Sequence, residues 1–215
     1  MKHLQRDLER LKKDILTMGS MVEEATNKAI TALLDRRPEL AYEVRNGDGL
    51  IDEKELEIEE DALKTLALHQ PVASDLRFVI TVLKVNNDLE RMGDLALNIA
   101  ERAAYLCKHD PVPLPDGFGR MGEMVRRMVK QSLDSLVALD TDLARTVLEE
   151  DDIVDDCHRD VFGQLQEMMY ADRETIERAI HTISASRNLE RIADLATNIA
   201  EDVVFLVEGD VIRHQ

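Results

Sequence analysis

The sequence predicts an all-α fold: two tandem, pseudo-symmetric three-helix bundles with six long helices. Trp is absent and aromatic residues make up only 3% of the chain, whereas residues that favour helices recur at helical spacing. The segment LERMGDLALNIAE at 89–101 returns as LERIADLATNIAE at 189–201, with 10 of 13 residues identical. A repeat of this length indicates two copies of one structural unit.

Prolines divide the chain into these units. Three of the five prolines crowd into DPVPLPDG at 110–117, which cannot remain helical, and Pro38 and Pro71 stand where new helices can begin. A second repeat, Met-Gly-x-Met-Val, starts at Met18 and again at Met121. We therefore expect a first bundle at 1–108, a linker at 109–117 and a second bundle at 118–215. The expected helices are 3–36, 38–69, 71–108, 118–139, 141–169 and 173–208.

The third helix of each copy carries an apolar seam with alternating spacings of three and four residues, which is typical of helix packing. Small residues beside the seam allow a neighbouring helix to approach closely. The seam comprises Leu89, Met92, Ala96, Ile99, Ala103 and Leu106, then Leu189, Ile192, Ala196, Ile199, Val203 and Leu206, with Gly93, Ala100, Ala193 and Ala200 beside it.

An acidic row runs along the same helices, nearly opposite the seam. Glu90 and Asp94 lie one turn apart on a single face. Like charges at this spacing destabilise an isolated helix by roughly 0.2–0.5 kcal/mol, so their duplication invites a bound cation as the explanation. Further polar residues extend the row, and the second copy repeats it: Asn98 and Glu101, then Glu190, Asp194, Asn198 and Glu201.

The second helix of each copy offers more carboxylates. Asp48 and Asp52 are four residues apart, Glu55 and Glu59 continue their face, and the matching positions of the second copy are Asp151, Asp155 and His158. Antiparallel neighbours would bring these rows together along an interhelical groove. Oxygen-rich sets of this kind suit Mg²⁺, Ca²⁺, Mn²⁺ or iron.

An ordinary solvated surface is the alternative for these rows. Arg91, Arg102 and Arg191 could neutralise the carboxylates through weak surface ion pairs. A histidine at position 158 is likewise more often a plain surface residue than a ligand.

Charge and composition narrow the class of partner. Asp and Glu number 44 against 27 Lys and Arg, for a net charge of −17, which argues against nucleic acid and favours cations and basic protein surfaces. Cys107 and Cys157 form neither a CxxC motif nor a disulfide framework, as expected of reduced thiols. No apolar run reaches the roughly 18–20 residues that span a bilayer. We expect a cytoplasmic protein that reaches membranes only through partners.

Motifs for catalysis are missing from the sequence. No Glu has a His three residues later, and there is no HExxH, no Gly-rich phosphate loop and no nucleophile elbow. The sequence therefore predicts a protein that is not an enzyme. A carboxylate-metal hydrolase or oxidase on a helical scaffold stays open as the alternative.

The repeated LER-x-x-D-L-A-x-N-I-A-E motif, the repeated Met-Gly-x-Met-Val motif and HQPVASDLRFV at 69–79 together resemble the PhoU family over essentially the whole chain. The resemblance implies a cytoplasmic negative regulator of phosphate uptake and of phosphate-starvation signalling. In this role the protein would link the ATPase of a phosphate ABC transporter to a sensor histidine kinase. A homodimer is also expected.

The resemblance further implies multinuclear metal clusters on the bundle surface, containing iron or else zinc, manganese or magnesium. Many relatives place His after the motif Asp of the second copy, where this chain has Leu195, so the two sites need not hold equal numbers of ions. The second copy also reads ADRETIE where the first has Pro71–Arg77. By position, the implied ligands are Asp48, Asp52, Glu90, Asp94, Asp151, Asp155, Glu190 and Asp194, with Asn98, Glu101, Asn198 and Glu201 as additions.

Overall fold

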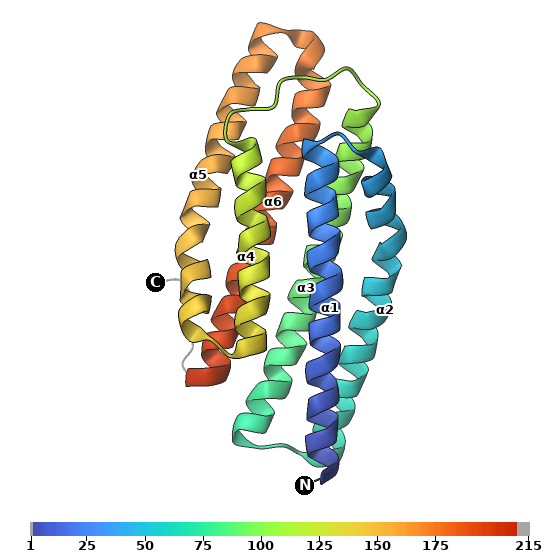
Figure 1. The fold of residues 1–215 in the computed structure, drawn as a ribbon, viewed down its shortest axis with the longest axis vertical. Coiled ribbons are helices and arrows are strands. Elements are labelled where there is room, and N and C mark those ends of the chain that lie inside the picture. The colour runs from blue at the N-terminus through green and yellow to red at the C-terminus, as the bar shows by residue number, and fades with distance from the viewer. Residues whose placement is uncertain (1, 210–215) are drawn as a thin grey trace.

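The computed structural model describes residues 2–209, which fold into six long helices without a β-strand (Figure 1). The prediction of an all-α fold is confirmed. A 3₁₀ turn, η1 at Arg173–Thr175, precedes the last helix. The helices are α1 (Lys2–Leu34), α2 (Pro38–His69), α3 (Ala73–Cys107), α4 (Phe118–Ala138), α5 (Thr141–Ala171) and α6 (Ile176–Glu208).

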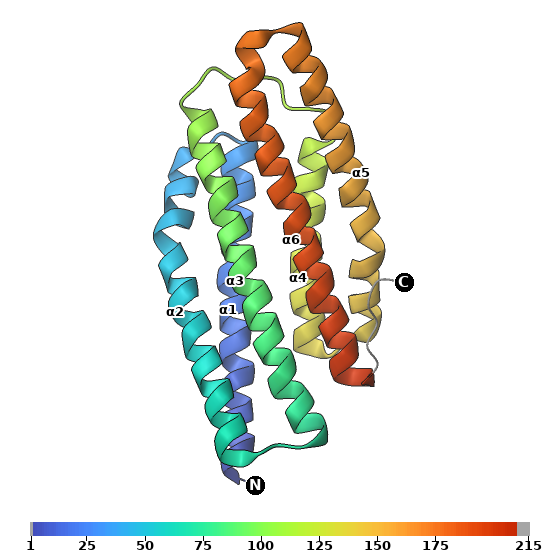
Figure 2. The ribbon, with the colours of Figure 1, turned by 180° about the vertical axis from the view of Figure 1, so that it is seen from behind.

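Helices α1, α2 and α3 pack as one bundle, and α4, α5 and α6 as the other. Seen from behind, α2, α3, α6 and α5 stand in that order, with α1 and α4 on the opposite side (Figure 2). The chain runs up and down in turn, so that α3 is antiparallel to α6, and α1 to α4, where the bundles meet. The two copies are thus related by a pseudo-twofold axis between α3 and α6.

The predicted helix ends are close to the observed ones, and backbone geometry explains the differences. α1 ends at Leu34 instead of 36, because Arg36 adopts a left-handed conformation with φ of 54°. α3 begins at Ala73 instead of 71, since Val72 is extended. The last helix begins as η1, and the Asp172 carboxylate accepts a hydrogen bond from the Glu174 N–H at 2.9 Å.

Glycines of the Met-Gly-x-Met-Val repeat bring α1 and α4 close together. A Cβ on Gly19 would lie 2.9 Å from Leu133 Cδ2, and one on Gly122 would lie 3.0 Å from Ile30 Cγ2. Residues 30 and 133 have the same spacing as residues 19 and 122, so the two contacts are symmetric. The repeated glycine is therefore explained by packing between the bundles.

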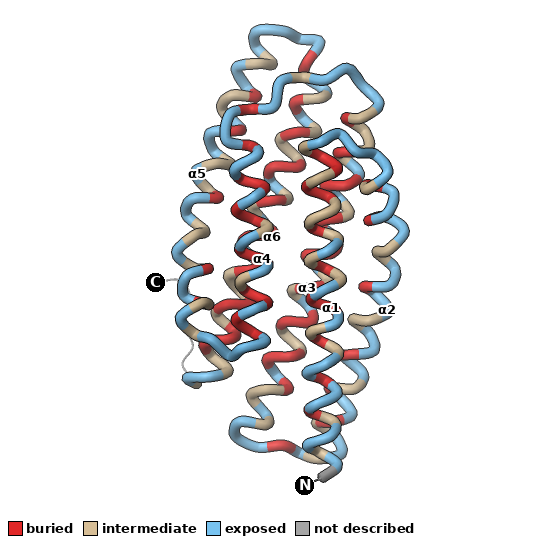
Figure 3. Tube along the Cα trace, viewed as in Figure 1, coloured by how far each residue is buried: buried red, intermediate tan, exposed pale blue. Residues whose placement is uncertain are grey.

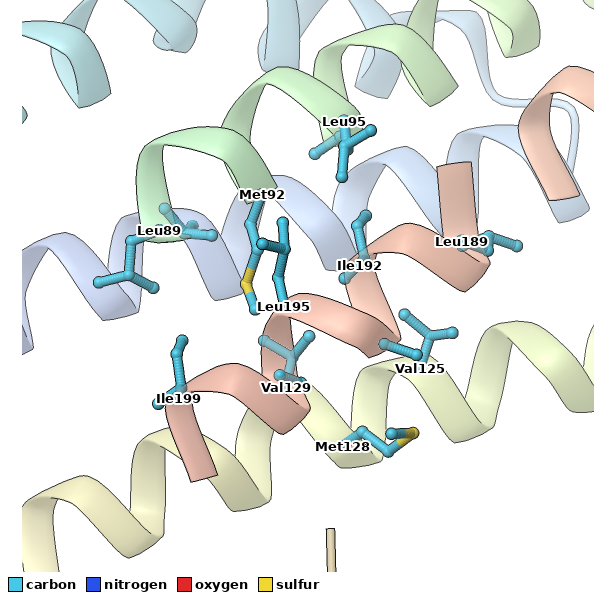
Figure 4. Packing of buried hydrophobic residues seen from close by; sticks show 14 of the residues in the cluster. Leu89, Met92, Leu95, Val125, Met128, Val129, Leu189, Ile192, Leu195 and Ile199 are labelled. Carbon is cyan, nitrogen blue, oxygen red and sulfur yellow. The ribbon is translucent and has the colours of Figure 1, made fainter. Parts of the chain in front are cut away.

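The apolar seams lie in the core, as predicted, and the buried residues line the inner faces of the helices (Figure 3). Only Leu206 at the end of the second seam is half-buried. Met92 and Leu95 of α3 lie toward Ile192 and Leu195 of α6, which joins the cores of the two bundles (Figure 4). The small residue Gly93 admits Ile51 of α2, whose side chain would lie 3.3 Å from an added Cβ.

Candidate metal centre

The α3 helix turns its two faces to different surroundings. Leu89 and Met92 are fully buried, whereas Glu90 is half-buried and Asp94 is exposed. Glu190 and Asp194 on α6 repeat this pattern. The acidic rows therefore lie opposite the packing seam, on the outer part of the bundles.

Five carboxylates of α2 and α3 lie close together and form what we call the first acidic cluster. They are Asp48, Asp52, Glu55, Glu90 and Asp94. Burial and the neighbouring Asp52 and Asp94 raise the pKa of Asp48. The pKa of Glu90 is also raised, by burial and by Asp94, Glu55 and Asp52. Residues of the two predicted rows thus face one another across the α2–α3 contact.

The second acidic cluster comprises Asp151, Asp155, Glu190 and Asp194, on α5 and α6. Burial, followed by repulsion from Asp194 and Asp155, raises the pKa of Asp151 to about 6. One of its oxygens, Oδ1, is buried without a hydrogen-bond partner. The pKa of Glu190 is raised too, by burial and then by Asp194 and Asp155.

These residues fit a bound cation. A buried carboxylate oxygen without a hydrogen-bond donor is costly, and several carboxylates close together repel one another. Hard and borderline divalent cations prefer such oxygen ligands. Arg91 and Arg191 offset part of the rise in the pKa of Glu90 and Glu190, respectively, as expected for the alternative of a solvated surface. Metal ligation by these residues stays a prediction.

The tightest carboxylate group lies elsewhere. Within residues 2–209, only Asp14, Glu57 and Asp61 bring three ligand atoms within 4.8 Å of one another. Arg10 lies 2.9 Å from Asp61, and Lys54 lies 2.6 Å from Asp14, so cationic side chains already balance this group. In the two acidic clusters the carboxylates are more widely spaced, and their side chains must turn inward to share an ion.

His158 stands at the edge of the second acidic cluster and is held by buried partners. Its Nδ1 lies 2.6 Å from the Ser186 hydroxyl, which donates to Met121 Sδ at 3.7 Å. Burial lowers the pKa of His158, although Asp155 opposes this effect. In the first copy the equivalent pair is Glu55 and Asn86. There the Asn86 side-chain amide donates a hydrogen bond to the backbone carbonyl of Glu55 at 3.0 Å.

A polar cavity of about 310 Å³ lies on the pseudo-twofold axis, and the sequence did not predict it. Asp94 of the first acidic cluster and Asp194 of the second both line this cavity. The cavity therefore lies between the two clusters and connects them. Leu195 lines this cavity, together with Leu95. The lining consists of Arg91, Asp94, Leu95, Asn98, Arg191, Asp194, Leu195 and Asn198.

The outermost predicted ligands lie outside this cavity. Glu101 is exposed and lies 3.7 Å from Arg102, while Glu201 is half-buried. Asn98 and Asn198 are in the cavity, which places them beside Asp94 and Asp194.

Comparison with known proteins gives the same repeat. The PhoU domain matches residues 15–103 and matches again at residues 118–203. The chain belongs to the PhoU family. Each match contains one acidic cluster, so the two clusters are corresponding parts of two PhoU domains.

PhoU relatives match nearly the full length of the chain. A phosphate-specific transport system accessory protein PhoU homologue of Aquifex aeolicus is 41% identical over 212 residues, covering 99% of this chain and 96% of the relative. The crystal structure of PhoU from Pseudomonas aeruginosa has a TM-score of 0.91 at 39% identity and covers 96% of this chain and 99% of that chain. PhoU from Streptococcus pneumoniae, described as a phosphate transport system regulatory protein, has a TM-score of 0.90 at 28% identity, with coverage of 98% of this chain and 100% of that chain.

Among residues 2–209, no helix has the length and apolar character needed to cross a membrane. Cys107 and Cys157 are both free thiols.

Proposed function

We propose that this protein is a cytoplasmic negative regulator of phosphate uptake and of phosphate-starvation signalling. The observation that carries the proposal is the match, over 99% of the chain, to a phosphate-specific transport system accessory protein. In the proposed role the protein is an adaptor between the ATPase of the phosphate ABC transporter and a sensor histidine kinase.

Acidic surface supports the adaptor role. The net charge of −17 attracts basic protein surfaces, and this attraction weakens as salt is added. A pull-down of the full chain with the transporter ATPase and with the cytoplasmic part of the kinase tests the role directly. Retention of both at low salt is expected, and loss of both would overturn the adaptor proposal.

Metal binding is the second part of the proposal. Each acidic cluster holds several metal ions, such as iron, zinc, manganese or magnesium, in a multinuclear site. Asp48, Asp52, Glu90 and Asp94 are the ligands in the first acidic cluster. The supporting observation is the buried Asp151 Oδ1 without a hydrogen-bond partner in the second. Elemental analysis of protein purified without chelator should find bound metal.

We also propose that the protein forms a homodimer. Light scattering of the purified chain should give twice the mass of 24.4 kDa. A mass equal to that of one chain would exclude the dimer.

A metal-dependent hydrolase or oxidase is the rival function, and the cavity beside Asp94 and Asp194 is the one observation that favours it. For an enzyme, Asp94→Asn should abolish turnover of a substrate while leaving the fold intact. For an adaptor, the same variant should change metal content and partner retention, and no turnover should be found in either form.

A further inference from the structure

The face of α1 and α3 that packs against the second bundle continues beyond the end of that bundle. α4 ends at Ala138 and α6 at Glu208, and below these ends α1 and α3 continue toward the lower end of the molecule (Figure 1). An apolar groove of about 530 Å³ lies there between α1, α3 and the last turns of α4 and α6. Its apolar lining includes Leu8, Ile15, Phe78, Val82, Leu136 and Leu139.

Small residues keep this groove open, whereas rings fill the matching space at the opposite end of the molecule. There the ring of Tyr105 on α3 stacks with those of His109 and His181, at centroid distances of 4.2 and 3.7 Å. One hundred positions away, the first histidine is matched by Gly209 and the second by Thr81. Thr81 lines the groove, as does the last turn of α6 just before Gly209.

The linker at 109–117 covers the matching face of the second bundle. Arg178 of α6 donates a hydrogen bond to the Asp110 carbonyl at 3.0 Å. The Asp116 N–H donates to Gln164 Oε1 of α5 at 2.9 Å. Figure 1 shows the linker passing the upper part of α6 on its way to α4. A non-helical segment with the sequence PVPLP, which follows α3, therefore covers this face in the second copy.

The segment DVIRHQ at 210–215 follows α6 as the linker follows α3. It lies outside the described residues. Asp210 matches Asp110 of the linker and Ile212 matches Val112, each one hundred positions apart. The two copies thus continue with similar residues after their third helix.

The last described residue brings the chain to the rim of the groove. Gly209 adopts a left-handed conformation with φ of 81°, and a Cβ there would collide with the guanidinium of Arg77, which lines the groove. Arg77 is one residue before the position that matches Arg178, which binds the linker. Six further residues in an extended chain span up to about 20 Å, or about two helix spacings, which is enough to cross from α6 to α1.

The segment at 210–215 suits the groove in both polarity and charge. Its two apolar residues, Val211 and Ile212, stand between Asp210 and Arg213. Burial of apolar side chains in an apolar groove removes both from water, which is favourable. The rim of the groove offers partners of both signs, namely Lys12, Arg77, Glu9 and Asp75.

We propose that the apolar groove binds an extended apolar segment, and that residues 210–215 of the same chain occupy it. Val211 and Ile212 lie in the groove, Asp210 faces Arg77, and Arg213 faces the carboxylates of the rim. The segment then covers the first bundle beyond the end of the second, as the linker covers the second beyond the end of the first. This inference does not depend on metal binding.

The experiment uses the full chain with a single tryptophan as reporter. The natural sequence contains no tryptophan, so the emission of Ile212→Trp reports on this position alone. In the groove the indole is shielded from water. Its emission should therefore lie at shorter wavelength than that of free tryptophan, and acrylamide should quench it several-fold less. Emission and quenching equal to those of free tryptophan would overturn the proposal.

Substitutions beside the groove test where the indole lies. Leu139→Asp places a charge in the lining and should return the emission of Ile212→Trp toward that of free tryptophan. Val207→Asp on α6 is a second variant of the lining, with the same expected result. Val137→Asp is the matched control, because Val137 is as exposed as Leu139, at 49% against 45%, but does not line the groove. Circular dichroism shows that each variant is folded. Equal emission in the lining variants and the control would overturn the proposal.

Two further measurements distinguish other occupants. The emission of Ile212→Trp should not change on dilution to concentrations at which light scattering finds single chains. A shift to longer wavelength on dilution would place the segment in the groove of a second copy and overturn its binding within one chain. The apolar dye anilinonaphthalene sulfonate should bind Val211→Asp/Ile212→Asp several-fold more than the natural chain, because the double variant frees the groove. Equal binding of the dye to both would show a groove open to small apolar ligands and would also overturn the proposal.

Discussion

Asp88 on α3 is half-buried, and burial together with the nearby Asp202 raises its pKa to about 6. Arg91 opposes this rise in the pKa of Asp88, and so does Lys84, which lies 2.5 Å from Asp202. Because the usual pKa of an aspartate is about 3.9, the folded chain binds this proton more strongly than the unfolded chain. The contribution of Asp88 to stability is therefore complete below about pH 4 and is lost as the pH rises through 6.

Asp88→Asn should therefore stabilise the protein at pH 7, because the amide avoids the cost of a buried charge. The second copy already has Asn188 at the matching position. Urea unfolding should show the advantage shrinking as the pH falls through 6 and vanishing below about 4. The reverse change, Asn188→Asp, is the matched control and should destabilise at pH 7. An Asp88→Asn variant no more stable than the natural chain at pH 7 would contradict the raised pKa.

At the scale of helices, the close approach of α1 and α4 depends on the repeated glycines. Gly122→Val adds methyl groups beside Ile30, whose β-branched side chain has little freedom to move. This overpacking should destabilise the protein by about 1–3 kcal/mol. Chemical denaturation measures the change.

Gly163→Val on α5 is the matched control, since nothing lies within 4 Å of an added Cβ there. Valine is a slightly better helix former than glycine, so this variant should be at least as stable as the natural chain. Equal effects of the two substitutions would show that helix propensity, and not the α1–α4 contact, governs position 122.

Helix faces could be predicted from the sequence because they depend only on residues within a few turns. The buried seam at Leu89 and Met92 and the outward row at Glu90 and Asp94 both follow from the helical period. The prediction that the acidic rows of α2 and α3 face one another followed from the antiparallel order of neighbouring helices. The end of α1 at Leu34 did not, because it depends on the left-handed backbone of Arg36, a residue type with no strong preference for that conformation.

At the scale of the whole molecule, the polar cavity between α3 and α6 could not be predicted from the sequence. It depends on how α3 and α6 cross, and its matched residues, such as Asp94 and Asp194, are one hundred positions apart. The repeat of residues 89–101 at 189–201 was the one sequence feature that pointed to this cavity. Equivalent helices of two copies often pack against each other across a twofold axis, which brings matched residues together. His158 was a candidate ligand from its position alone, and only the contact with Ser186 shows how its ring is held.

The two bundles should unfold together. Their cores are continuous through α3 and α6, and Lys84 of one bundle pairs with the buried Asp202 of the other at 2.5 Å. Calorimetry of the metal-free chain should give one transition, with equal calorimetric and van't Hoff enthalpies. Two separate transitions would show that each bundle folds on its own.

Metal binding at the acidic clusters is tested most directly by the melting temperature of the metal-free chain with and without added Mn²⁺ or Zn²⁺. Metal at about 100 times its dissociation constant stabilises a protein by about 2.7 kcal/mol, which raises the melting temperature of a chain of this size by about 5–10 °C. The natural chain should show this increase, and Glu90→Gln/Asp94→Asn should lose the part due to the first cluster. A natural chain whose melting temperature is unchanged by either metal would contradict metal binding.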